Sequence, residues 1–106
     1  MDITNILKTE ADKIFDAVEA ELVRLGHDPT KGHFLITREK MMIILAPTGL
    51  MPYLPTVRGA SKRIAAIIKD SPRMRDHRHG TTRGWLFRGK ESTDLIVKKP
   101  MVIREN

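Results

Sequence analysis

The chain has 106 residues, a formal net charge of +6 and no cysteine. This length fits a single domain, and the lack of cysteine excludes a disulfide scaffold, thiolate zinc sites and thiol catalysis. No apolar run approaches the roughly 18 residues that a membrane-spanning helix needs, and the N-terminus lacks the pattern of a secretory signal. We therefore expect a cytoplasmic protein with no membrane partner.

The first 25 residues predict one long amphipathic helix over residues 2–25, because apolar side chains recur at steps of three or four. Asp2 is the expected N-cap, and Gly26 stands where a left-handed C-cap belongs. The apolar stripe consists of Ile3, Leu7, Ala11, Ile14, Val18, Leu22 and Leu25. We expect it to join the core, and because it is long for a small domain, a homodimer through this helix is the alternative.

Residues 33–46 allow two interpretations. After a loop at 27–32, residues 33–36 are a short apolar strand candidate. Thr37 can then cap a short helix through Ala46, ended by Pro47, or residues 41–45 can form a second strand paired with 33–36. Periodicity does not decide over so short a run, and we favour the helix. Residues 47–55 contain three prolines and are predicted as loop or turn.

A second amphipathic helix is predicted over residues 57–70, capped by Thr56 and ended by Pro72. On a helical wheel of about 100° per residue, one side carries apolar residues: Val57, Ala60, Ile64, Ile67 and Ile68. The opposite side carries Arg58, Lys62 and Lys69, and Arg63 lies between the two faces. The helix therefore presents a basic stripe opposite its core-facing side.

The segment after Pro72 has the alternation and turn residues of a β-hairpin. One face of its first strand is expected to carry four basic side chains: Arg73, Arg75, His77 and His79. The other face carries Met74, Asp76 and Arg78. Residues 80–82 are the predicted turn, and residues 83–88 are the return strand. Residues 91–106 are expected to supply a C-terminal strand or arm, in which Pro100 indicates a sheet edge or a bulge.

The positive charge is confined to the second helix and the hairpin. Residues 58–90 carry ten Lys and Arg against only Asp70 and Asp76, and the remainder of the chain is close to neutral. Clustered Lys and Arg neutralise phosphates and release counterions. This segment therefore predicts an anionic partner, of which nucleic acid is the commonest.

The order of predicted elements resembles the winged helix-turn-helix domains. The residues that carry the resemblance are VRGASKRIAAIIKDS (57–71) and PRMRDHRHGTTRGWLFRG (72–89). Those domains run helix, strand, helix, recognition helix and two-stranded wing. The resemblance implies an α+β fold in which residues 1–106 form one winged-helix-like domain, with helix 57–70 in a groove of duplex DNA and hairpin 72–89 as the wing. It also implies that Trp85 and Phe87 pack the wing onto the helix.

The function implied by this resemblance is binding of double-stranded DNA without catalysis, a cofactor or a metal. We expect a regulator of transcription or replication, with phage and mobile-element proteins among the candidates. The predicted nucleic-acid-binding residues are Arg58, Lys62, Arg63, Lys69, Arg73, Arg75, His77, Arg78, His79 and Arg83.

Two other functions stay open. His77 and His79 share a strand face and, with Asp70 or Asp76, could bind a metal or cleave RNA, as small basic ribonuclease toxins do. No metal-ligand spacing, paired-carboxylate motif or nucleophile context completes such a site, so no catalytic residue is predicted. A protein-binding inhibitor or adaptor of phage type would also fit a basic surface.

Overall fold

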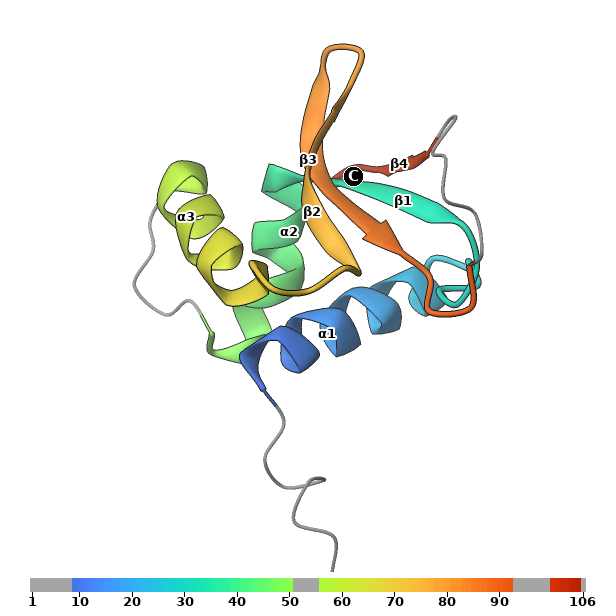
Figure 1. The fold of residues 1–106 in the computed structure, drawn as a ribbon, viewed down its shortest axis with the longest axis horizontal. Helices are drawn as coiled ribbons and strands as arrows, with labels where there is room; N and C mark the ends of the chain where they lie inside the picture. Colours follow the sequence, from blue (N-terminus) through green and yellow to red (C-terminus); the bar gives the residue numbers. More distant parts are fainter. Residues whose placement is uncertain (1–8, 51–55, 93–99, 106) are drawn as a thin grey trace, which may run out of the picture.

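The computed structural model describes residues 9–50, 56–92 and 100–105. Within these ranges the chain forms three helices and a four-stranded mixed sheet, so the α+β class is confirmed (Figure 1). In chain order the elements are α1 (Glu10–Arg24), β1 (His33–Thr37), α2 (Arg38–Leu45), the short 3₁₀ helix η2 (Ala46–Thr48), α3 (Val57–Ile68), β2 (Met74–His79), β3 (Thr82–Arg88) and β4 (Met101–Ile103). The helix that we favoured after Thr37 is therefore present, and the alternative strand is not formed.

The first helix begins later than predicted. Its N-cap is Thr9, whose backbone is extended and whose hydroxyl accepts a hydrogen bond from the Asp12 amide at 3.1 Å. The prediction that Asp2 caps this helix is therefore wrong for α1, because Thr9 already satisfies an amide of its first turn. Asp2 itself lies outside the described residues, as do Ile3 and Leu7.

The other end of α1 follows the prediction. Gly26 has a φ of 89°, and the amides of Gly26 and His27 donate back to the carbonyls of Val23 and Leu22. This pair of bonds is the left-handed glycine cap that satisfies the last carbonyls of a helix. The chain thereby reverses into the loop before β1.

The sheet joins the two halves of the chain, with strand order β2-β3-β1-β4. β1 and β3 are antiparallel, and their register sets Phe34 opposite Phe87 and Ile36 opposite Trp85. β4 pairs with the other side of β1 in parallel and lies at the sheet edge, as Pro100 predicted. The remainder of the predicted C-terminal strand, residues 94–99, lies outside the described residues.

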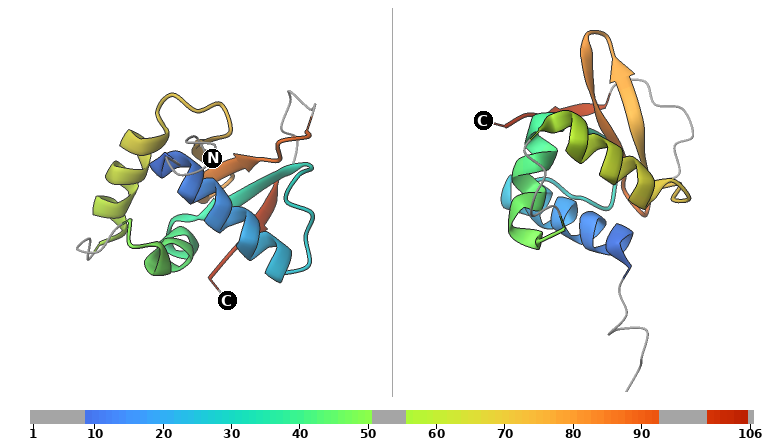
Figure 2. Two further views of the ribbon diagram at one scale, coloured as in Figure 1. Left: turned by 90° about the horizontal axis from the view of Figure 1, so that it is seen from below. Right: turned by 90° about the vertical axis from the view of Figure 1, so that its left-hand side faces the viewer.

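The three helices gather on one side of the sheet (Figures 1 and 2). Their apolar faces and the facing side chains of the strands form one buried cluster. The larger side chains of this core are Ile14, Phe15, Val18, Leu22, Phe34, Ile36, Met41, Ile44, Leu45, Ile64, Ile68, Met74, Trp85, Phe87 and Ile103. Ile14, Val18 and Leu22 of the α1 stripe are buried in this cluster, whereas Leu25 is 40% exposed.

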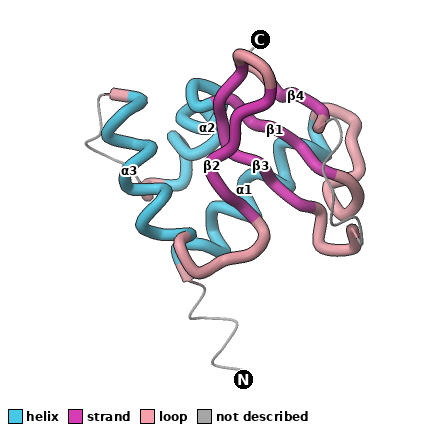
Figure 3. The backbone as a smooth tube through the Cα atoms, turned by 45° about the horizontal axis from the view of Figure 1, so that its top comes forward, coloured by secondary structure: helices cyan, strands magenta, loops and turns pink. Residues whose placement is uncertain are grey.

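A close contact between β1 and β3 decides where the hairpin leaves the sheet. β1 ends at Thr37, whose hydroxyl accepts the Lys40 amide at 3.2 Å and so caps α2. Gly84 pairs with Thr37, and a Cβ at Gly84 would lie 2.2 Å from the carbonyl oxygen of Ile36. Beyond this pair the β2–β3 hairpin continues without β1 and projects from the body of the protein (Figures 1 and 3).

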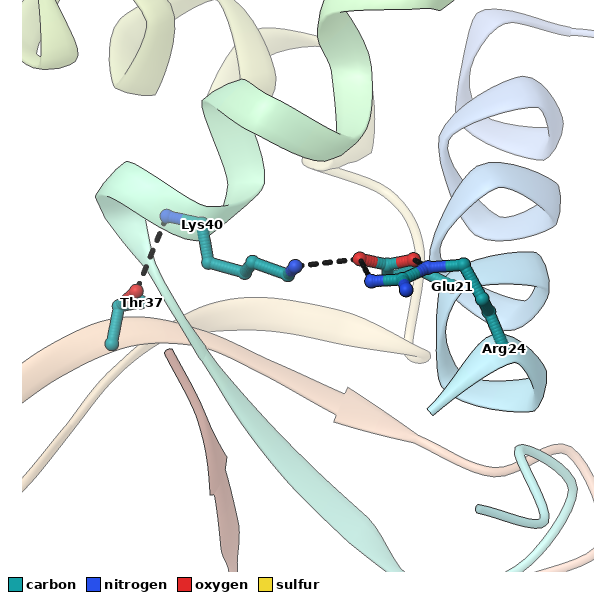
Figure 4. A network of polar contacts seen from close by, with 4 residues as sticks. All are labelled: Glu21, Arg24, Thr37 and Lys40. Carbon is teal, nitrogen blue, oxygen red and sulfur yellow. Dashed lines mark hydrogen bonds and ion pairs between the residues drawn. The ribbon is translucent and has the colours of Figure 1, made fainter. Parts of the chain in front are cut away.

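A buried ion pair joins the first two helices (Figure 4). The side chain of Lys40 on α2 is only 6% exposed, and its Nζ donates to Glu21 Oε2 on α1 at 2.5 Å. Arg24 reaches the same carboxylate from one turn further along α1. The hydrogen bonds from Arg24 and Lys40 lower the pKa of Glu21 from 4.5 to about 2. Glu21 therefore stays ionised and neutralises a lysine that has little access to water.

We predict that Glu21→Gln is strongly destabilising, by roughly 3–5 kcal/mol, because it leaves the Lys40 ammonium buried without a counter-charge. Urea unfolding followed by circular dichroism measures this loss. The double variant Glu21→Gln, Lys40→Met removes both charges and should recover most of the stability. A double variant as unstable as Glu21→Gln alone would show that the ion pair does not cause the loss.

The same ion pair predicts acid sensitivity. The folded-state pKa of Glu21 is about 2 against an ordinary value of 4.5, so its contribution is complete above pH 4.5 and is lost as the pH falls toward 2. The free energy of unfolding of the wild type should fall more over this interval than that of the double variant. Parallel urea titrations at several pH values make the comparison, and equal slopes for the two proteins would contradict it.

Candidate nucleic-acid interface

The outer face of α3 carries the basic stripe that the sequence predicts. Thr56 caps the helix by accepting the Gly59 amide at 3.0 Å, and Ala60, Ile64 and Ile68 are buried. Arg58, Lys62 and Lys69 are exposed on the opposite side. Within the described part of the chain no carboxylate forms an ion pair with them. These three cations are available to an external anion.

Arg63, which the sequence placed between the two faces of this helix, is used within the protein. Its Nε donates to the carbonyl oxygen of Leu50 at 3.0 Å, and its Nη2 donates to Glu10 Oε2 at 3.0 Å. The side chain thus links α3 to the start of α1 and to the loop after η2. We therefore leave Arg63 out of the candidate interface.

Arg73 also makes its contacts within the protein. β2 begins at Met74, so the predicted alternation does not extend back to Arg73, and the expectation that it shares a face with Arg75 is wrong. Its guanidinium carbon lies 5.0 Å from the ring centre of Phe15 and 4.8 Å from that of Phe87. The Glu19 carboxylate lies 3.5 Å away. Arg73 therefore joins the hairpin base to α1 through two aromatic rings.

From Met74 onward the predicted alternation holds and divides the hairpin cations between two faces. The register sets Asp76 opposite Trp85 and Arg78 opposite Arg83, so these four share the face that continues the core side of β3. Arg75 and two histidines belong to the other face: His77 opposite Gly84, and His79 opposite Thr82. The register therefore places Arg78 and Arg83 together and sets Arg75 and His79 on the other face, while His77, although on that other face, lines one hollow with Asp76, Arg78 and Arg83.

The two aromatic residues of β3 are in the core, and Phe87 contacts α1 and not the predicted helix 57–70. Trp85 and Phe87 are both buried, and the Phe87 ring lies 6.1 Å from that of Phe15, with the two planes tilted. Phe15 belongs to α1, so this contact fixes the hairpin base on the first helix. β2 in turn packs beside α3, which places the basic helix next to the hairpin.

Asp76 is the centre of a cluster of arginines at the base of the projecting part of the hairpin. Arg83 donates to it twice, through Nε at 3.3 Å and Nη2 at 2.7 Å. Arg38, the first residue of α2, donates through Nη2 at 3.4 Å. The hydrogen bonds from Arg83, with the charges of Arg83 and Arg38, lower the pKa of Asp76.

Arg38 is the residue of this cluster that sequence reasoning missed. It stands in the near-neutral half of the chain, 38 positions before Asp76. Only the pairing of Thr37 with Gly84 brings it to the hairpin. The helix cap at Thr37 was visible in the sequence, but that pairing was not.

The histidines do not assemble into a metal site in the described part of the chain. No group of three or more His, Asp and Glu residues there could hold a metal ion. Burial lowers the pKa of His77, and the positive charge of Arg75 lowers it further. At neutral pH His77 is therefore an uncharged side chain within a basic strand.

Comparison with known protein families, with curated proteins and with solved structures finds no match to this chain. None of the helices that the structure describes has the length and apolar character of a membrane-spanning segment.

We predict that Arg73→Ala lowers the free energy of unfolding by about 1–2 kcal/mol, because both ring contacts and the approach to Glu19 are lost. Arg75→Ala removes the same charge two residues further along, from a side chain that is exposed and outside the core, and should change stability by less than about 0.5 kcal/mol. Urea unfolding of the two variants measures the difference. Equal losses would show that the Arg73 contacts do not stabilise the fold.

Proposed function

We propose that this protein is a winged-helix-type domain that binds duplex DNA without catalysing a reaction. The order helix, strand, helix, helix and hairpin, with β1 paired to β3, supports this arrangement. The observation that carries the proposal is the exposed stripe of Arg58, Lys62 and Lys69 on α3, which has no ion-pair partner in the described residues and lies beside a projecting basic hairpin.

The shape of α3 suits a groove. A helix of this kind fits the major groove of B-DNA, which is about 12 Å wide. Ala65 and Ala66 are exposed among the cations, so the backbone of α3 can approach the edges of the bases closely. Seen from the side of α3, the helix lies nearest the viewer and the hairpin rises above it (Figure 2). The hairpin can therefore reach the sugar-phosphate backbone next to the groove that α3 occupies.

The proposed binding surface is smaller than the one predicted from the sequence. Its helix contribution is Arg58, Lys62 and Lys69, and its hairpin contribution is Arg78 and Arg83. Arg75, His77 and His79 belong to the opposite hairpin face by register, and of the three only His79 adjoins the hairpin turn and is assigned to a contact at the wing tip; Arg75 lies opposite Leu86, where the hairpin runs beside β1. Arg63 and Arg73 are excluded, since both are bonded within the fold. A cytoplasmic regulator of transcription or replication is the role that such binding supports.

We predict that the protein binds a duplex of about 20 base pairs with an affinity that falls steeply with salt. The logarithm of the binding constant should fall with slope of about −0.9 per phosphate neutralised, so Arg58→Ala and Lys62→Ala should each reduce the slope by about 0.9. Fluorescence anisotropy at several salt concentrations measures these slopes.

Lys13→Ala is the matched control, because it removes one exposed cation that belongs to α1 and not to α3 or the hairpin. Its slope should equal that of the wild type. Absence of duplex binding at low salt would exclude the proposed function, and equal effects of all three substitutions would exclude α3 as the binding face. Tighter binding to single-stranded RNA than to duplex DNA would contradict the proposal that α3 binds in a DNA groove.

A further inference from the structure

The arginine cluster at the hairpin base has the composition of an anion-binding site. Arg38 and Arg83 both pair with a single carboxylate, that of Asp76, and Arg78 lies opposite Arg83 on the same strand face, so these four side chains carry a net charge of +2 (three cations less one anion). A hollow of about 230 Å³ is lined by Asp76, His77, Arg78 and Arg83. His77 adds little charge there, because its pKa is lowered. The cluster therefore keeps an uncompensated positive charge beside an open space.

The carboxylate leaves most of the arginine donors unused. A guanidinium carries five N–H groups in a rigid fork. Arg83 uses Nε and Nη2 on Asp76, and Arg38 uses Nη2, while the Nε of Arg38 is buried without a partner in the described residues, so it is the Nη nitrogens that can reach an external anion. Arg78 lies directly across from Arg83 and forms no ion pair in the described part of the chain. Planar arginine forks held in fixed orientations match the oxygens of a phosphate group.

We propose that Arg38, Arg78 and Arg83 form a phosphate clamp that binds one backbone phosphodiester group of duplex DNA. This inference rests on the proposed function and adds Arg38 to its binding surface. Asp76 is a positioning residue of the clamp, because its carboxylate holds Arg38 of α2 and Arg83 of β3 at one point. Since α2 also packs on α3, the clamp fixes the hairpin relative to the groove-binding helix.

The test is the salt dependence of duplex binding by Arg38→Ala. The loss of one phosphate contact should reduce the slope of the wild type by about 0.9, whereas Lys13→Ala leaves it unchanged. Thermal unfolding of both variants confirms that they are folded, and Arg38→Gln serves as a second variant with a longer side chain. The clamp is overturned if Arg38→Ala, Arg38→Gln and Lys13→Ala all bind duplex with the same salt slope. The proposed function would be unaffected by that result. A wild type that does not bind duplex at all would overturn both.

Asp76→Asn tests the positioning role. Asp70→Asn is its control, since Asp70 is exposed at the end of α3 and forms no ion pair in the described residues. Both variants lose one negative charge, but only Asp76→Asn releases the two guanidiniums. Asp76→Asn should therefore bind duplex more weakly than Asp70→Asn, and Arg38→Ala should have a smaller effect in the Asp76→Asn background than in the wild type. The positioning role is overturned if Asp76→Asn and Asp70→Asn bind duplex equally and Arg38→Ala has the same effect in the Asp76→Asn background as in the wild type. Asp76 would then act through its charge alone.

Inorganic phosphate distinguishes the DNA backbone from the free anion as the ligand. The free anion is the ligand if calorimetric titration shows that wild type binds inorganic phosphate and Arg38→Ala does not, while both bind duplex with the same salt slope. That result would overturn the assignment to the backbone.

Discussion

The pairing of Thr37 with Gly84 is the constraint on which the rest of the arrangement depends. On one side of it, β1 must end, because the Thr37 hydroxyl caps α2 and the chain turns into a helix. On the other side, β3 must pass so close to the Ile36 carbonyl that no side chain fits at position 84. The hairpin therefore loses its neighbouring strand at this point and continues alone into solvent. The same pairing brings the start of α2 to the hairpin, which is why Arg38 meets Asp76.

Below this junction the β1–β3 register aligns the aromatic and branched side chains that hold the helices. Phe34 and Phe87 are paired, as are Ile36 and Trp85, so one face of the sheet offers a continuous apolar surface. A shift of the register by one residue would turn every one of these side chains to the other face. Arg73 adds to the same face from outside the strand, because its guanidinium covers the rings of Phe15 and Phe87. The position of the hairpin base is therefore set by packing in the core and not by contacts within the hairpin.

Much of this could be predicted from the sequence where the signal is local. The caps at Thr37 and Thr56, the glycine cap at Gly26 and the apolar side of α3 each depend on a few neighbouring residues, and each is found in the structure. Charge alone does not show which cations are free. The helical wheel places Arg63 between the two faces of α3, but it does not show that this side chain meets Glu10 and the Leu50 carbonyl. Such contacts join residues far apart in the chain, so no local pattern reports them.

The acidic and basic halves of the sequence are complementary parts of one fold. Glu10, Glu19 and Glu21 of α1 each approach a cation of a different segment: Arg63 of α3, Arg73 before β2, and Lys40 of α2. The Glu10–Arg63 pair is half exposed and contributes little free energy, while the Glu21–Lys40 pair is largely buried and must stay intact. Because α1 takes up Arg63 and Arg73, the cations left on the surface of the 58–90 segment are those of the outer face of α3 and of the hairpin. The acidic helix α1 thereby separates the cations of the 58–90 segment into those bonded within the fold and those left on its surface. The cations left on the surface are the ones that can neutralise phosphates.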